Sequence, residues 1–561
     1  MANSFDLGPV RTFTMLRAGR KAAAVVLFGL SLLTAVGFGV LHSSASAAMS
    51  FDQLETRDPQ VSAPAGTFQG LRQDGVDAFL GIPYARSPVG SLRWRTPEAL
   101  PRIETVYRAQ SFGDSCPQRT IVRSFAPPND ISEDCLHLNI WRPANAPDGP
   151  LPVLFWIYGG GFYIGTSATE TYDGARLASR NAIVVTINYR IGRLGFLAHP
   201  ALSAESPDGV SGNYGLHDVI AALQWVEDNV ASFGGDADNV TIFGQSAGAV
   251  IVGTMMALPE ADGLFDKAFI LSGGPSLSLR HRSRNGGPGF ESLETLGQRF
   301  AQALVGEEDS PDILEQMRRA TPDEVLEASF ASGRNLGDGT RDHLAIDGTL
   351  ITEAPGQALQ QGRFRSVPLL IGATADEGTA FLNAAQIDSP ARYEEVMRNL
   401  LGDDAETALR LYPAGVDTDS AKAAYAEFLT DVLNCQMRLV ARANAGREQS
   451  TFFYEFARVP DYAAEIGIDA SHGVDLGYWF GNFAERHQLN ADDRRVSDLM
   501  IGYLISFAAD GDPNHEGAPH WPGFVSADGE RHMEFDIVSA AQPFRRQEQC
   551  DFINPRLLNQ N

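Results

Sequence analysis

The sequence predicts an α/β protein with a mostly parallel central sheet and helices on both of its faces. Apolar runs that end in glycine or polar residues recur along the chain, as expected of buried strands, at 151–158, 182–189, 240–243, 268–271, 367–372 and 451–456. Segments with apolar residues at helical spacing lie between several of these runs, at 216–230 and 421–433. Strands that alternate with helices favour a parallel sheet that is covered on both sides.

A single large domain is expected over residues 48–561. The chain has 561 residues, and we find no clear break in composition, no internal repeat and no low-complexity tract. Its 44% hydrophobic and 20% charged residues are ordinary for a soluble globular protein. The formal net charge of −26 argues against nucleic acid as a partner, because a polyanion would be repelled.

The N-terminal segment has the three parts of a secretory signal. Basic residues at 17, 20 and 21 precede a long apolar run at 22–41, and small residues at Ala45 and Ala47 follow it. We therefore expect residues 1–47 to be a signal peptide and the mature protein to be secreted or periplasmic. The alternative is an uncleaved membrane anchor, because the apolar run is about as long as a membrane-spanning helix.

Four cysteines, Cys116, Cys135, Cys435 and Cys550, follow this export signal. An even number of cysteines in an exported protein predicts two disulfides, for which three pairings are possible. No spacing resembles a zinc site such as C-x-x-C, so no cysteine-ligated metal is expected.

The stretch VTIFGQSAGAVIVGTMM, residues 240–256, places a serine between a predicted strand and a predicted helix. Gly244 and Gly248 flank Ser246 in a G-x-S-x-G pattern, in which the glycines let strand and helix approach closely. The serine is either a filler in a glycine turn or a nucleophile, and the flanking strand and helix favour the nucleophile.

A serine hydroxyl needs a base and a group that orients the base, and both follow the serine in proteins with this turn. Asp376 and Glu377 come just past the predicted strand 367–372, and His472 comes after the predicted strand 451–456. The competing downstream histidines are His281, His343, His487, His515, His520 and His532.

Three consecutive glycines follow the predicted strand 151–158, within WIYGGGFYIG at 156–165. Residues without a Cβ atom let successive backbone N–H groups point at one substrate oxygen, as an oxyanion hole requires. A flexible turn is the alternative reading of the same glycines.

Together with these motifs, further blocks resemble the type-B carboxylesterase family, which includes the cholinesterases. The similar blocks follow the family's order and cover about residues 60–555, at 79–94, 132–141, 156–165, 188–197, 212–218, 243–248, 375–381, 471–481, 507–514 and 547–554. The resemblance implies the α/β-hydrolase fold with inserted helices around an active-site gorge. It also implies a serine hydrolase of small-molecule carboxylic esters that needs no cofactor and no metal.

The resemblance implies roles for individual residues. Ser246 corresponds to the nucleophile, Glu377 to the triad acid and His472 to the base, which leaves Asp376 as a bystander. The N–H groups of Gly160, Gly161 and Ala247 correspond to the oxyanion hole. The resemblance further implies the disulfides Cys116–Cys135 and Cys435–Cys550 and a structural ion pair between Arg93 and Glu133.

The chain departs from the family pattern around the expected substrate. Gln245 precedes the nucleophile where the family usually has glutamate, and the segment 116–135 lacks the tryptophan that cholinesterases carry there. Leu279 stands where cholinesterases have a tryptophan in the acyl pocket. These departures argue against a choline ester. A lipase or amidase of the same fold, and a noncatalytic adhesion module, remain the alternative functions.

Overall fold

The structure is a computed structural model, and it describes residues 58–119, 127–275, 279–285, 291–332, 343–465, 467–483 and 489–558. The predicted signal peptide, 1–47, lies outside the described residues, so its cleavage and the domain boundary at residue 48 stay predictions. No helix within the described ranges is both long enough and apolar enough to cross a membrane.

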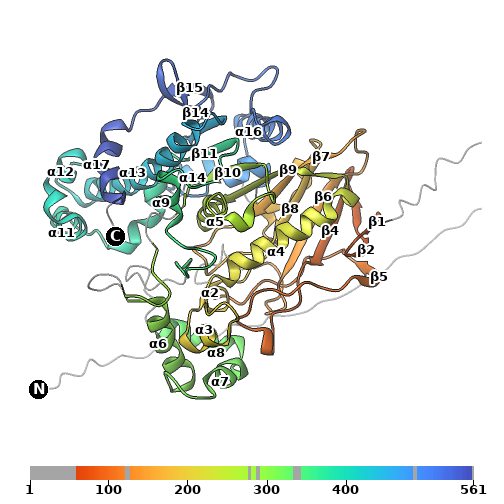
Figure 1. Ribbon diagram of the computed structural model, residues 1–561. Coiled ribbons are helices and arrows are strands. Elements are labelled where there is room, and N and C mark those ends of the chain that lie inside the picture. Colours follow the sequence, from red (N-terminus) through yellow and green to blue (C-terminus); the bar gives the residue numbers. More distant parts are fainter. Residues whose placement is uncertain are drawn as a thin grey trace, which may run out of the picture. The chain divides into compact units, whose positions relative to one another are not determined.

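A large sheet forms the centre of the described fold (Figure 1). Its strands lie in the order β13-β14-β12-β11-β10-β9-β7-β8-β6-β4-β3, and β15 pairs with β14. The strands are β3 (Leu71–Gln73), β4 (Val76–Pro83), β6 (His137–Pro143), β7 (Leu151–Ile157), β8 (Ile183–Ile187), β9 (Gly235–Gln245), β10 (Lys267–Leu271), β11 (Leu369–Thr374), β12 (Thr451–Phe456), β13 (Val525–Ser526), β14 (Gly529–Phe535) and β15 (Ala540–Pro543).

The middle of this sheet is parallel, from β8 through β7, β9, β10, β11 and β12 to β14. Both flanks are antiparallel, through β6, β4 and β3 on one side and β13 and β15 on the other. All six predicted strands are present, and the prediction of a mostly parallel α/β sheet is confirmed.

The described α-helices surround the sheet. They are α1 (Ala175–Ala178), α2 (Gly192–Phe196), α3 (Pro200–Glu205), α4 (Tyr214–Asn229), α5 (Ala247–Met255), α6 (Leu293–Val305), α7 (Ile313–Arg319), α8 (Pro322–Ala331), α9 (Pro355–Gln360), α10 (Leu382–Ala385), α11 (Pro390–Leu401), α12 (Ala405–Leu411), α13 (Thr418–Ala445), α14 (Asp461–Ala464), α15 (Leu476–Phe480), α16 (Ala491–Asp510) and α17 (Gln547–Leu558). A small separate sheet contains β1 (Gln60–Ala63), β2 (Gly66–Gln69) and β5 (Ile103–Arg108).

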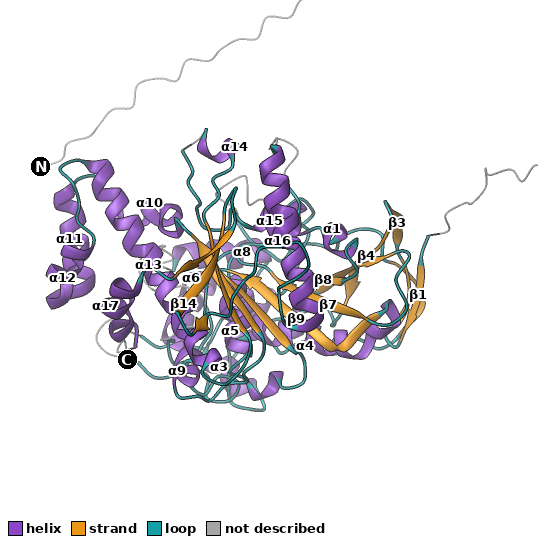
Figure 2. Ribbon diagram, turned by 90° about the horizontal axis from the view of Figure 1, so that it is seen from above, coloured by secondary structure: helices purple, strands orange, loops and turns teal. Residues whose placement is uncertain are grey.

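Helices cover both faces of the sheet, which explains why its central strands are buried throughout (Figure 2). On one face, Phe480 and Trp479 of α15 pack edge-on against Trp156 and Phe269. Helices α4 and α5 lie on the opposite face (Figure 2). The central strands carry apolar side chains on both faces, and helices cover both faces. The hydrophobic core therefore consists of two layers, one on each side of the sheet.

Two disulfides join Cys116 to Cys135 and Cys435 to Cys550, which are the pairs that the resemblance implies. Cys550 lies in α17, so the second bridge fixes the C-terminal helix to Cys435 in α13. The predicted ion pair is confirmed: Arg93 Nη2 lies 2.6 Å from Glu133 Oε2, and both side chains are almost fully buried.

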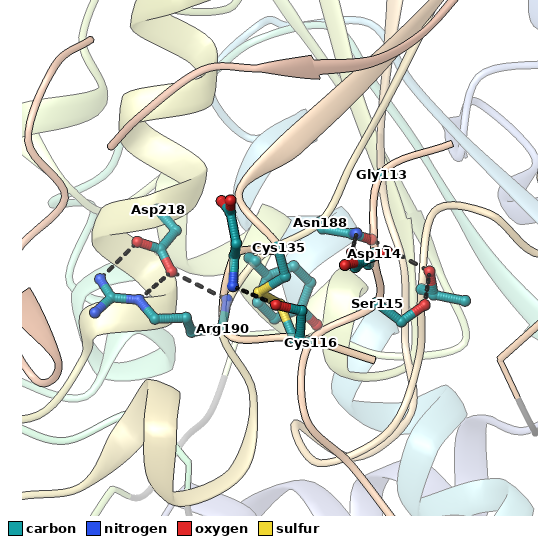
Figure 3. Close-up of a disulfide and its surroundings, with 12 residues drawn as sticks. Gly113, Asp114, Ser115, Cys116, Cys135, Asn188, Arg190 and Asp218 are labelled. Atoms are coloured by element: carbon teal, nitrogen blue, oxygen red, sulfur yellow. Dashed lines mark hydrogen bonds and ion pairs between the residues drawn. A yellow bond between two sulfur atoms is a disulfide. The ribbon is translucent and has the colours of Figure 1, made fainter. Parts of the chain in front are cut away.

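The first disulfide lies among buried polar contacts that fix the segment around it (Figure 3). Asn188 Nδ2 donates to the carbonyl of Asp114 at 3.0 Å, and Ser115 Oγ donates to Thr166 Oγ1 at 2.8 Å. Nearby, Arg190 forms a buried ion pair with Asp218 of α4 at 2.7 Å. The disulfide segment is thereby tied to the residues that follow β8 and to the chain at Thr166.

Candidate active site

Ser246 lies at a sharp turn between β9, which ends at Gln245, and α5, which begins at Ala247. Its backbone has φ 55° and ψ −120°, a strained conformation for a residue other than glycine. The flanking glycines are required by close packing, because a Cβ atom at Gly248 would lie 2.0 Å from the carbonyl oxygen of Ile157. The turn therefore places the Ser246 side chain at the carboxyl end of the central sheet.

Glu377 and His472 come from two neighbouring strands and meet at the carboxyl end of the sheet. Glu377 begins a short 3-10 helix after β11, and His472 lies in the connection after β12. His472 Nδ1 is hydrogen-bonded to Glu377 Oε2, while the backbone N–H of Thr374 donates to Glu377 Oε1 at 2.8 Å. Both carboxylate oxygens of Glu377 are therefore engaged, and the imidazole is held with Nδ1 toward the acid.

The electrostatics of this pair favour an ionised acid next to a basic imidazole. Burial alone would lower the pKa of His472, but the charge of Glu377 and the hydrogen bond to it outweigh burial, so the pKa is raised. Burial likewise opposes ionisation of Glu377, yet the charge of His472 and the hydrogen bonds from His472, Ser272 and the Thr374 N–H lower its pKa. At neutral pH the pair can take up a proton on His472 Nε2.

Asp376 occupies a different position from its neighbour Glu377. Its Oδ2 accepts a hydrogen bond from the backbone N–H of Ala470 at 3.1 Å, and burial raises its pKa. Asp376 thus fixes the connection that carries His472, whereas the imidazole itself is hydrogen-bonded to Glu377.

Gln245 is a site residue whose contact with His472 the sequence does not reveal. Its Nε2 lies 3.0 Å from His472 Nε2, and the side chain is only 5% exposed. With Nδ1 facing Glu377, the lone pair of Nε2 faces the amide of Gln245. The adjacency of Gln245 to Ser246 was the one signal in the sequence.

The glycines of the predicted oxyanion loop have backbone conformations that side chains disfavour. Gly160 has φ 111° and Gly161 has φ 63°, and a Cβ atom at Gly160 would lie 2.1 Å from the carbonyl oxygen of Ile164. Gln118 fixes the end of this loop, because its amide both donates to and accepts from the backbone of Gly165, at 2.8 and 2.9 Å. Ala247 contributes the first N–H of α5, where a helix has no internal acceptor.

A further buried carboxylate lies near the imidazole. Asp475 is fully buried, and burial together with the charge of Glu377 raises its pKa to about 6. The hydroxyl of Tyr454 donates to Asp475 Oδ2 at 2.8 Å. The charge of Asp475 contributes to the raised pKa of His472. The ring of Phe381 lies 5.0 Å from the ring of His472, and its side chain is exposed.

The other candidate histidines have different surroundings. His515 stacks on Tyr503, His520 is exposed, and His532 is buried in β14. His487 lies outside the described residues. Among the described histidines, the hydrogen bond to a fully buried carboxylate at the carboxyl end of the sheet distinguishes His472.

Comparison with known proteins places this site in context. Residues 57–553 match the sequence model of the carboxylesterase family. The chain is 35% identical to a fumonisin B1 esterase of Sphingopyxis macrogoltabida over 84% of this chain and 86% of the relative. It is 32% identical to a para-nitrobenzyl esterase of Bacillus subtilis (83% and 92%) and 30% identical to a cholinesterase of Mus musculus (89% and 84%).

Proposed function

Since this chain belongs to the carboxylesterase family and is a carboxylic-ester hydrolase, we propose that it acts through an acyl-enzyme formed on Ser246. His472 Nε2 takes the proton of the Ser246 hydroxyl as the oxygen attacks the ester carbonyl. The negative oxygen that develops is stabilised by the N–H groups of Gly160, Gly161 and Ala247.

The second half of the reaction uses the same groups. His472 gives its proton to the departing alcohol, which leaves the acyl group on Ser246. Water then loses a proton to His472 and attacks the acyl carbon, and the acid product leaves as Ser246 regains its proton. Glu377 holds the Nδ1–H tautomer and stabilises the imidazolium in both halves.

The hydrogen bond between His472 Nδ1 and buried Glu377 is the observation that carries this proposal. It leaves one basic nitrogen free of the acid, in contact with Gln245, the residue that precedes Ser246 in a strained strand-to-helix turn. The 3.0 Å contact from Gln245 to this nitrogen implies that Ser246 takes over the acceptor when substrate enters. Hydrogen bonds of this kind often tighten only when the substrate is bound.

The Ser246→Ala variant tests the nucleophile, with Ser329→Ala as a matched control at a buried serine of α8 whose hydroxyl donates to the Val325 carbonyl in its own helix. On an aryl ester, we expect Ser246→Ala to lose nearly all turnover, with at most about 10³-fold acceleration over water left by the oxyanion hole. Ser329→Ala should keep most of its activity. Near-normal turnover by Ser246→Ala would contradict the mechanism.

We further propose that the preferred substrate is a neutral ester. Gln245 places a neutral amide beside the imidazole, and Leu279, which packs partly buried against the core, supplies no aromatic face for a cation. A desolvated cation–π contact contributes about 2 kcal/mol, and exposed negative charge is screened beyond about 8 Å at physiological salt.

A matched pair of esters tests this preference: butyrylcholine and its uncharged analogue 3,3-dimethylbutyl butyrate. We expect kcat/KM for the neutral ester to equal or exceed that for the choline ester. A preference of more than about tenfold for butyrylcholine, or about 1.4 kcal/mol, would contradict the proposal. Efficient turnover of amides, or activation at an emulsion surface, would favour the amidase or lipase alternative.

We also propose that the protein is exported and that cleavage follows Ala47. Two disulfides support an oxidising compartment, because such bridges are rare where thiols are kept reduced. N-terminal sequencing of the protein recovered outside the cytoplasm should begin at residue 48. Recovery of an intact N-terminus in the membrane fraction would support the anchor instead.

A further inference from the structure

A histidine and two glutamates lie together on the sheet face opposite the Tyr454 side, outside the catalytic site. Glu455 is on β12, and His532 and Glu534 are on the adjacent strand β14. One ligand-capable atom from each of the three side chains lies within 4.8 Å of the others. The linear sequence hides this cluster, because Glu455 is far from the other two residues along the chain.

The register of the two strands explains why the side chains meet. Glu455 pairs with Glu534 in the parallel ladder, so the two carboxylates project side by side from the same face. His532 precedes Glu534 by two residues and therefore points to that face as well. Like charges directly opposite each other destabilise a sheet unless a cation compensates them.

His532 is the most unusual member of the cluster. It is 3% exposed, and neither of its ring nitrogens has a hydrogen-bond partner among the described residues. Its Nε2 faces Glu455 Oε1 at 4.0 Å. A neutral imidazole has one ring nitrogen with a free lone pair, which is the form that binds metal ions. A buried polar group without a partner is costly, which points to a missing ligand.

The neighbouring arginines do not occupy the ligand atoms of Glu455, His532 and Glu534 that face one another. Arg546 lies 3.5 Å from the other oxygen of Glu455, Oε2, and is also hydrogen-bonded to Asp431. Arg531 donates to the carbonyl of Ala541, and Arg545 donates to the side chain of Gln542. These guanidinium groups reduce the local negative charge but have other acceptors, so Glu455 Oε1 and the carboxylate of Glu534 still face His532.

We propose that Glu455, His532 and Glu534 bind one divalent transition-metal ion, with Zn²⁺ as the probe of choice. One imidazole nitrogen and two carboxylate oxygens form a ligand set that suits Zn²⁺, and water completes the coordination. Ligand atoms around tetrahedral zinc lie roughly 3.3 Å apart, so closing the 4.0 Å gap between His532 and Glu455 needs only a small side-chain shift.

The bound ion would have a structural role in this chain. It would neutralise the paired carboxylates, satisfy the buried imidazole and link β12 to β14. Strand β12 leads into the connection that carries His472, while β14 leads toward the C-terminal helix α17. The site takes no part in ester hydrolysis, so the proposal does not depend on the catalytic mechanism.

Zn²⁺ titration of the chelator-treated, redialysed full chain tests the site by calorimetry. We expect one equivalent to bind, with the affinity lowered at least tenfold in His532→Gln and in Glu534→Gln. The matched control His520→Gln removes an exposed histidine and should bind as tightly as the unchanged protein. Hydrolysis of a neutral aryl ester serves as the check that each variant is folded. If His532→Gln does not fold, the Zn²⁺ affinity of Glu534→Gln tests the proposal.

A second probe reports on the ligands directly. Co²⁺ in place of Zn²⁺ should give visible absorption bands that both site variants lose and His520→Gln keeps. Saturating Zn²⁺ should also raise the thermal midpoint of the unchanged protein, because a ligand that binds only the folded state stabilises it. Absence of stoichiometric binding, or equal affinity in the unchanged protein and a folded site variant, would overturn the proposal.

Discussion

The Asp475→Asn substitution should change both the pH dependence of stability and the pH profile of catalysis. Asp475 is fully buried, and its pKa is raised from 3.8 to about 6 in the folded protein. Its folded form therefore binds a proton more tightly than its unfolded form, and this contribution to stability is lost as pH rises from about 4 through 6. Two pKa units correspond to about 3 kcal/mol.

Asparagine has nearly the same shape and can still accept the hydrogen bond from Tyr454, but it cannot ionise. The difference in unfolding free energy between Asp475→Asn and the unchanged protein should therefore shift in favour of the variant by about 3 kcal/mol between pH 4 and pH 8. Urea unfolding at several pH values measures this difference. A difference that stays constant across the range would refute the reasoning.

The catalytic profile gives an independent test of the same charge. Asp475 raises the pKa of His472, so its removal should move the acid limb of kcat/KM to lower pH. The matched control is Asp493→Asn, which removes another buried carboxylate that accepts from a tyrosine hydroxyl, that of Tyr478. The control should leave the acid limb unchanged. Movement of the acid limb of kcat/KM to higher pH in Asp475→Asn would contradict the inference that the charge of Asp475 raises the pKa of His472.

Two further substitutions probe the groups around His472. Glu377→Gln should lower kcat by about 10⁴-fold, because the tautomer of His472 is no longer set. Asp376→Asn retains an acceptor for the Ala470 N–H and should lower kcat far less. Equal losses of kcat in steady-state assays would reverse the choice of acid. Gln245→Glu places a carboxylate about 4 Å or less from His472 Nε2. At this distance and an effective dielectric of 20, the attraction between the carboxylate and the imidazolium is at most about 4 kcal/mol. The acid limb of kcat/KM should therefore rise by one to about three units, and an unmoved limb would exclude this contact.

The central strands were predictable because both of their faces are buried. Strands β7 and β12 follow the apolar runs 151–158 and 451–456 almost residue for residue. Strand β9 begins at Gly235, five residues before its apolar run, because the polar segment there pairs with β7. Helix α13 extends to Ala445, beyond the predicted 433, since its later turns bury polar groups that break the apolar pattern.

The site was predictable to different depths. The glycines around Ser246 indicate the turn by themselves, because only close packing explains them. Asp376 and Glu377 both follow the same strand, so their order alone could not separate the proposed triad acid from its neighbour. The contact between Gln245 and His472 depends on how a side chain turns across the sheet edge. The cluster around His532 depends on the register of β12 and β14, which local sequence does not encode.

Covalent labelling by an organophosphate tests the proposed nucleophile most directly, because only an activated serine reacts with it stoichiometrically. Intact-mass analysis of the full chain should show one adduct per chain, and peptide mapping should locate it on Ser246. The rate of labelling should fall with the loss of ester hydrolysis in Glu377→Gln. An adduct on another serine, or the absence of labelling in an enzyme that still hydrolyses esters, would contradict the account.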